Sequence, residues 1–140
     1  MKKIKNEKGQ SLVEMAVSLV LLLLLLSGAV EFGMAFFQFI QLRDAAQEGA
    51  FYGSIDPTNI AAIKLRTQNA SNTPIDLTTL TPQVNYIGDG QACEKTGNAI
   101  KVTLSYNHKI FMPFMSGILG RTTIPLTATV TDTILSPGCP

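Results

Sequence analysis

The pattern of apolar and polar residues divides the chain into two parts. No charged residue occurs in residues 15–30, and extending this stretch to residue 40 admits only Glu31. At about 1.5 Å per helical residue, residues 15–40 reach about 39 Å, which exceeds the hydrocarbon thickness of about 30 Å. The pattern therefore predicts one transmembrane helix.

The helical pattern continues beyond this apolar stretch. Residues 41–48 are good or tolerable helix formers, so we expect one helix over about residues 11–52. Small residues recur along it at intervals of four, a spacing that lets another backbone approach closely. They are Ala29, Gly33, Ala45, Gly49 and Gly53. Two interpretations stay open: helix packing against other subunits or, for the outer residues, packing against this chain's own sheet.

The apolar positions change their period in the second part. Asp56 and Pro57 place a capping side chain before a proline suited to a first helical turn, which predicts a short helix over residues 58–68. Later segments alternate apolar and polar residues, as half-buried strands do. These segments are residues 84–86, 100–106 and 124–130. The sequence therefore predicts three strands.

The apolar stretch of residues 110–119 separates the last two predicted strands. We expect it to cover the sheet, and a contact patch is the alternative for its exposed large side chains. Those side chains are Phe111, Met112, Phe114 and Met115.

Together these patterns predict an α+β fold with a long N-terminal transmembrane helix, a short second helix and a small antiparallel sheet of about three strands. The expected organisation is a cytoplasmic leader at residues 1–9, the long helix at residues 10–54 and an extracytoplasmic α+β domain at residues 55–140.

Charge sets the expected orientation and excludes one class of partner. Four lysines and one glutamate give the first nine residues a net charge of +3, which predicts a cytoplasmic N-terminus and a single-pass topology. The net charge of the whole chain is only +1. Nucleic-acid binding depends on many cationic contacts with phosphate, so we expect no nucleic-acid partner.

A small residue lies before the apolar stretch instead of after it. Gly9 follows the lysine-rich tip, and Glu14 lies at the edge of the apolar stretch. A secretory signal peptide is cut after its apolar region, whereas a cut at Gly9 would leave that region in the mature protein. An ordinary uncleaved signal anchor is the alternative, and it needs neither Gly9 nor Glu14.

The sequence lacks the usual signatures of catalysis and of metal binding. It contains no phosphate-binding glycine loop, no cysteine pair at metal spacing and no nucleophile elbow, so we expect no enzyme activity, cofactor or metal. The lone His108 is expected to be a surface imidazole and not a general base. Cys93 and Cys139 fall in the part expected outside the membrane, where a disulfide between them can form, and two free thiols are the alternative.

Residues 9–54 resemble the TadE-like minor pilins, or pseudopilins, of the bacterial tight-adherence (Flp) pilus system. The resemblance is carried by residues 9–14, the leucine run at residues 21–26, residues 31–33 and residues 44–52. The chain departs from the family at Val20, where a proline is common, and at Phe51, where an arginine is common.

The resemblance implies cleavage by a prepilin peptidase between Gly9 and Gln10, which makes Glu14 the fifth residue of the mature protein. A carboxylate near hydrocarbon is costly unless paired, so Glu14 would meet the new ammonium at Gln10, in its own chain or a neighbouring one, during assembly. The alternative for Glu14 is a solvated residue favoured by the helix dipole.

The function implied is that of a pilin-like protein of the bacterial cytoplasmic membrane. It would act by subunit contacts in the assembly or structure of an adhesion pilus, and its place in the surface fibre is left open. The implied partners are other pilins or pseudopilins, the prepilin peptidase, the inner-membrane assembly platform and the lipid bilayer. A single-pass anchored binding or adaptor domain unrelated to pili is the first alternative. A secreted enzyme retained by an uncleaved signal is the second.

Overall fold

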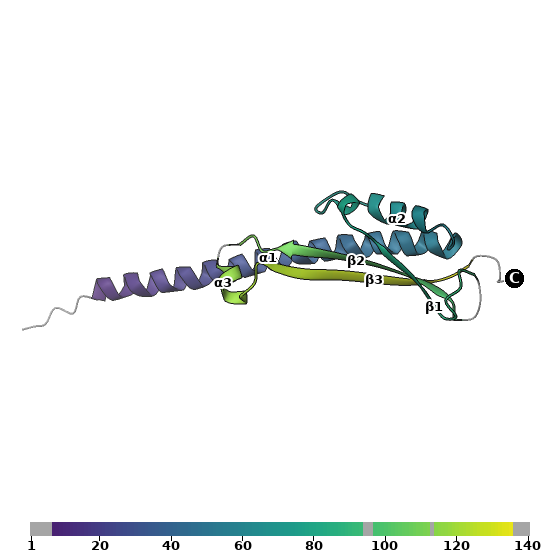
Figure 1. The fold of residues 1–140 in the computed structure, drawn as a ribbon. Helices are drawn as coiled ribbons and strands as arrows, with labels where there is room; N and C mark the ends of the chain where they lie inside the picture. Colours follow the sequence, from purple (N-terminus) through teal and green to yellow (C-terminus); the bar gives the residue numbers. More distant parts are fainter. Residues whose placement is uncertain (1–6, 94–96, 113, 136–140) are drawn as a thin grey trace, which may run out of the picture.

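The structure, a computed structural model, describes residues 7–93, 97–112 and 114–135 and confirms the predicted α+β fold. One long helix, α1, extends through most of the molecule, and the sheet and a second helix lie along its outer half (Figure 1). The elements are α1 (Glu7–Ile55), α2 (Ile60–Asn69), the 3-10 helix η1 (Leu77–Thr79), β1 (Gln83–Ile87), β2 (Ala99–Lys109), α3 (Met115–Leu119) and β3 (Thr123–Thr133).

Helix α2 begins later than predicted, and Asp56 is not its cap. The side chain of Asn59 caps the helix by accepting a hydrogen bond from the Ala62 amide at 3.1 Å. Asp56 instead accepts one from the Thr58 hydroxyl at 3.3 Å. The chain turns at Pro57 before α2 begins, and since Asp and Asn are equally good caps, residue type alone did not distinguish the two positions.

The three strands form one antiparallel sheet in the order β1-β2-β3. Val102 in the central strand pairs with Val84 on one side and with Val130 on the other. Alternation along β2 buries Ile100, Val102 and Leu104 on one face, as the period of two predicts. This face packs against α1.

The core lies between that sheet face, the outer half of α1 and α2. Its fully buried members include Leu42, Ala45, Ala46, Ala50, Ile63, Leu77, Ile100, Val102, Leu104 and Ile134. Polar groups at its edge are paired: the Gln41 amide exchanges two hydrogen bonds of 2.8 Å with the backbone of Ile75. The Tyr86 hydroxyl donates to the Pro57 carbonyl, and burial raises the pKa of this phenol.

The segment between β2 and β3 does not cover the sheet as expected. Helix α3 lies beyond the end of the sheet and beside the middle of α1 (Figure 1), and Phe111 and Phe114 are 77% and 79% exposed. Helices α1 and α2 already cover the core face of the sheet. The segment therefore finds no uncovered apolar surface on that face against which to pack.

Cys93 is buried in the segment that follows β1. Cys139 lies outside the described residues, and the pairing of the two cysteines stays a prediction.

Candidate functional site

The first half of α1 exposes apolar side chains on all sides. Within residues 12–26, every large apolar side chain is exposed, from 41% at Leu24 to 69% at Leu25. A helix that is hydrophobic all round is stable inside a membrane or a large core, and no element of the described residues covers residues 12–26. The helix is long and apolar enough to cross a membrane. It therefore indicates a single-pass membrane anchor.

The predicted processing residues lie at the start of this half. Gly9 and Gln10 are exposed and already helical. The Gln10 amide donates to the Glu14 carboxylate at 3.3 Å, one helical turn away, and Glu14 is exposed. The chain's own fold thus leaves Gly9, Gln10 and Glu14 open to contact from outside.

The small residues divide into two groups. Ala45, Gly49 and Gly53 are buried in the chain's own fold, where Gly49 faces Thr67 and Gly53 faces Ile100. Ala29 and Gly33 are exposed, and a Cβ atom added at Gly33 would have no atom within 4 Å. The outer residues therefore follow the second interpretation, and contact with other subunits stays a prediction for Ala29 and Gly33.

A buried acid joins the middle of α1 to the end of the sheet. Glu31 is 3% exposed, and its Oε1 lies 2.6 Å from His108 Nε2. The Met112 amide donates to the same carboxylate at 2.7 Å, and the Phe111 amide donates at 3.1 Å. The second ring nitrogen of His108 lies 2.6 Å from Gln38 Oε1. We name Glu31, Gln38 and His108 the helix–sheet junction.

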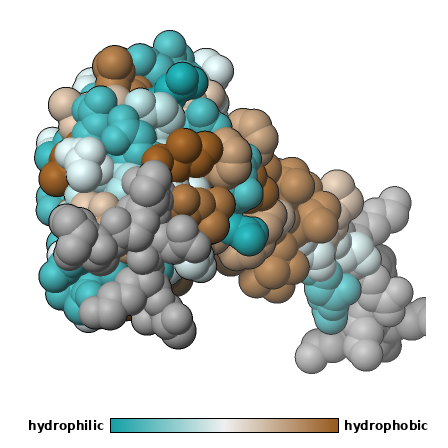
Figure 2. Space-filling model, turned by 90° about the vertical axis from the view of Figure 1, so that its right-hand side faces the viewer, coloured by the Kyte–Doolittle hydropathy of each residue, from teal (hydrophilic) through white to brown (hydrophobic). Residues whose placement is uncertain are grey.

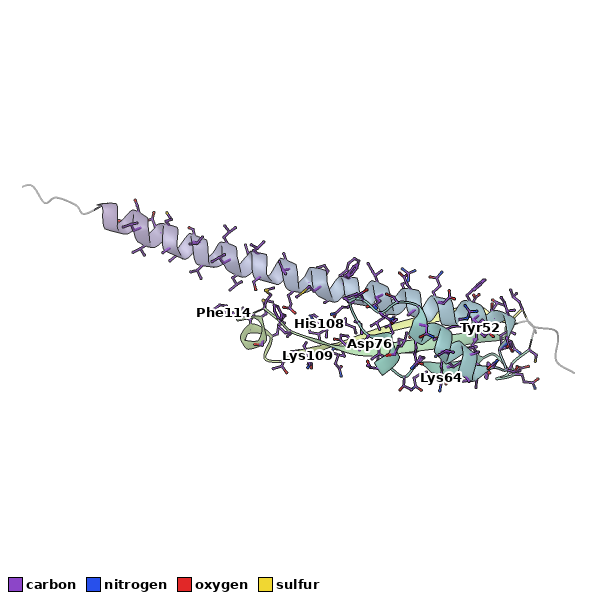
Figure 3. The ribbon with its side chains drawn as sticks, turned by 90° about the horizontal axis from the view of Figure 1, so that it is seen from above. Tyr52, Lys64, Asp76, His108, Lys109 and Phe114 are labelled. Atoms are coloured by element: carbon purple, nitrogen blue, oxygen red, sulfur yellow. The ribbon has the colours of Figure 1, made fainter. Side chains whose placement is uncertain are left out.

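Local structure brings these residues together. Glu31 and Gln38 are seven positions apart on α1, so they lie on the same face two turns from each other. Alternation along β2 places His108 on the face that carries Leu104, directed at α1 (Figure 3). Phe111 and Met112 lie two and three residues after the end of β2 at Lys109, where their amides are free of the sheet ladder and can donate to Glu31.

Hydrogen bonds compensate the buried acid of the junction. The two ring nitrogens of His108 each lie 2.6 Å from an oxygen atom, one of Gln38 and one of Glu31. An isolated buried carboxylate would be costly, and here His108 and two backbone amides compensate it. The junction therefore fixes the sheet on the helix at the end of the exposed half.

Two expectations about these residues need correction. His108 is 2% exposed, so the prediction of a surface imidazole was wrong. The sequence pattern predicted no role for Glu31. The available signal was the cost of an unpaired carboxylate within an apolar stretch, which requires a partner elsewhere in the chain. The error at His108 has a different cause: a position near the end of a predicted strand does not indicate whether another element covers that residue.

No three side chains of His, Cys, Asp or Glu gather as a metal-binding group within residues 7–93, 97–112 and 114–135. The junction pairs one acid with one histidine, and its chemistry is that of a structural contact.

Comparison with known proteins bears on the first part of the chain. The model of the TadE-like protein family matches residues 9–50. This segment is TadE-like. The resemblance predicted from the sequence is thus confirmed over these residues. No curated protein and no solved structure matches the chain.

The TadE-like segment contains Gly9, Gln10, Glu14 and Glu31. It ends before α2 and the sheet, so His108 lies outside it. The exposed half of α1 and the acid of the junction therefore belong to the family segment, whereas the domain attached to them does not.

Proposed function

We propose that this chain is a membrane-anchored, pilin-like subunit that acts by protein contacts in the assembly or structure of a Tad adhesion pilus. One observation carries the proposal: a TadE-like helix exposes apolar side chains on every side of its first half, while its second half is occupied by the chain's own domain. A helix of this kind can pass from lipid into a bundle of similar helices without refolding the domain.

Processing at Gly9 is part of the proposal. A cut between Gly9 and Gln10 by a prepilin peptidase removes the lysine-rich leader, residues 1–9, and creates an ammonium at Gln10. Gln10 and Glu14 are one turn apart and both exposed. The new ammonium can therefore pair with Glu14 of its own chain or of a neighbouring subunit.

The peptide bond to be cut lies inside α1 in the uncut chain. A protease binds its substrate in an extended form, so the first turn must unwind at the cut. Glycine is among the weakest helix formers, which lowers the cost of unwinding at Gly9.

The expected topology places the lysines in the cytoplasm and residues 55–140 outside it. Partners on the pathway are the prepilin peptidase, other pilins or pseudopilins, and the inner-membrane assembly platform.

The experiment compares Glu14→Ala with Asp44→Ala, an exposed acid on the outer half of the same helix. Both variants replace the native copy in cells that assemble the pilus. We expect both proteins to insert and to be cleaved, because the apolar stretch is unchanged, but only Glu14→Ala to reduce pilus formation. Normal piliation with Glu14→Ala would remove the pairing argument.

Gly9→Leu tests the processing step separately. A bulky side chain should block a site that accepts glycine, so the variant should keep its leader while the native protein begins at Gln10. Intact mass and N-terminal sequencing of membrane-extracted protein measure this. A native chain that keeps residues 1–9 in cells with an active peptidase would favour an anchored adaptor instead.

A further inference from the structure

The segment between β2 and β3 carries a second exposed apolar surface. We name residues 110–112 and 114–119 the apolar tip; it contains no charged residue, and Lys109 and Arg121 flank it. Its exposed large side chains are Phe111, Phe114, Ile118 and Leu119. Grouped apolar exposure of this kind indicates a contact surface.

The tip lies beside the part of α1 that approaches the membrane. In helix α3 of the tip, the terminal methyl carbon of Met115 would lie 4.0 Å from a Cβ atom at Gly28. Figure 3 shows Phe114 at the end of the domain that is nearest to the N-terminal half of α1. The position of Gly28 in the membrane therefore sets the depth of the tip.

Helix geometry limits that depth. If the hydrocarbon begins at Met15, about 30 Å of helix extends it to about Met34. If it begins at Gln10, the same length ends near Ala29. Gly28 lies within the hydrocarbon or at its boundary in both cases. The first placement therefore brings the tip into the adjacent leaflet, and the second brings it to the boundary between hydrocarbon and head groups.

An apolar groove connects the tip to α1. It has a volume of about 390 Å³ and is lined by residues of α1, α3 and β3, among them Phe32, Phe36, Leu119 and Leu126. The rings of Phe32 and Phe36 stack with centroids 6.0 Å apart, and both side chains are more than half exposed. Figure 2 shows apolar surface along the helix where it leaves the domain. The tip is thus continuous with the membrane-spanning surface.

Several backbone amides of the tip have hydrogen-bond partners within the chain. An unpaired backbone N–H group is costly in or near hydrocarbon. The Phe111 and Met112 amides donate to Glu31, the Ile110 amide donates to the Thr122 carbonyl at 3.0 Å, and the Ile118 amide donates to the Phe114 carbonyl at 3.0 Å. The buried acid therefore also supplies acceptors to the tip backbone.

We propose that the apolar tip is a second membrane contact, in which Phe111, Phe114 and Ile118 enter the hydrocarbon of the leaflet nearest the sheet. The flanking cations lie at the level of the lipid head groups, where Lys and Arg extend their charged ends. Lipid is the occupant because both placements of α1 bring the tip to the hydrocarbon or to its boundary, and the exposed side chains of the tip are apolar. The inference depends on α1 spanning the membrane and not on a role in a pilus.

Tryptophan fluorescence tests the depth, because the chain contains no tryptophan and an introduced one is the sole reporter. The full-length variants Phe111→Trp and Phe114→Trp are placed in phosphatidylcholine nanodiscs, one copy per disc. Brominated acyl chains should quench most of their emission, and aqueous acrylamide little of it. Leu22→Trp in the middle of the span is the lipid control, and Phe51→Trp at the far end of α1 is the aqueous control.

The outcomes separate the tip from the span. Acrylamide quenching at both tip positions, with bromolipid quenching at Leu22→Trp, would overturn the inference and leave the span intact. If bromolipids did not quench Leu22→Trp, α1 would not span the membrane, and both the proposed membrane-anchored function and the lipid contact of the tip would be contradicted. Protection of the tip that appears only in discs with several copies would assign it to a second copy of the chain and overturn the lipid contact.

Discussion

Leu22 and Leu42 lie on one uninterrupted helix, yet Leu22 is 61% exposed and Leu42 is fully buried. The first half of α1 carries large apolar residues on every side, so no single apolar face distinguishes one side of the helix as the place for a sheet. The outer half places small residues on one face, with Ala45, Ala46 and Ala50 fully buried there. The comparison shows that the width of the apolar surface, and not apolarity alone, separates a membrane surface from a core surface.

The glycines of α1 show the same difference between a packed and an exposed helix surface. A Cβ atom at Gly49 would overlap the Thr67 hydroxyl, whereas one at Gly33 would meet no atom within 4 Å. The spacing of small residues is the same in both halves, so spacing alone does not say which partner approaches.

The largest expected effect lies where the two halves meet. His108→Leu leaves the buried Glu31 carboxylate without its histidine partner, and removal of one partner from a buried pair costs about 3 to 5 kcal/mol. Thermal unfolding of the detergent-solubilised protein should show a marked fall in melting temperature. Lys109→Leu, at the exposed neighbouring position, is the control. Equal stability of the two variants would contradict a stabilising contact between His108 and Glu31.

A similar loss is expected from the predicted disulfide. A Cys93–Cys139 bridge closes a loop of 46 positions, worth roughly 4 kcal/mol in the chain-entropy model. Cys139→Ser should therefore lower the melting temperature of the sheet domain and leave membrane insertion unchanged. Alkylation without reductant checks the pairing, since full labelling of both thiols in protein from an oxidising compartment would rule it out.

The two leucines give the most direct comparison of the halves. Leu42→Ala creates a cavity between α1 and the sheet and should cost about 2 to 5 kcal/mol, while Leu22→Ala removes a side chain that is 61% exposed in the described part of the chain. Chemical denaturation of both variants in the same detergent measures the difference. Equal destabilisation would mean that the two halves are packed alike.

The smallest effect is expected from the glycines. Gly49→Ala should cost about 1 to 3 kcal/mol because the methyl group overpacks the contact with α2. Gly33→Ala should change stability by no more than about 0.5 kcal/mol. The same denaturation experiment applies, and a large loss at Gly33 would place a hidden packing partner there.

Local pattern predicted much of this fold. The continuous apolar stretch predicted the exposed half of α1, and the alternation around Val102 predicted the buried face of β2. Both patterns depend only on neighbours along the chain. The sequence could not decide which partner faced Gly49, since that depends on how the domain folds back on α1.

Long-range pairing explains what was missed at the site. His108 and Glu31 are far apart in sequence, and nothing near His108 indicates that a helix covers the end of β2. The same holds for the apolar tip, whose exposure follows from a sheet face that was already covered. Gly9 and Glu14, by contrast, were predicted from their position at the edge of the apolar stretch, and their roles stay predictions.

Site-specific photo-crosslinking tests the central claim most directly. A photoreactive residue replaces Leu25 in the exposed half or Gln47 on the exposed side of the outer half, in cells with a complete pilus system. The account predicts crosslinks from position 25 to another pilin-type subunit, identified by mass spectrometry, and none from position 47. Crosslinks from position 47 alone, or only lipid adducts at position 25, would contradict it.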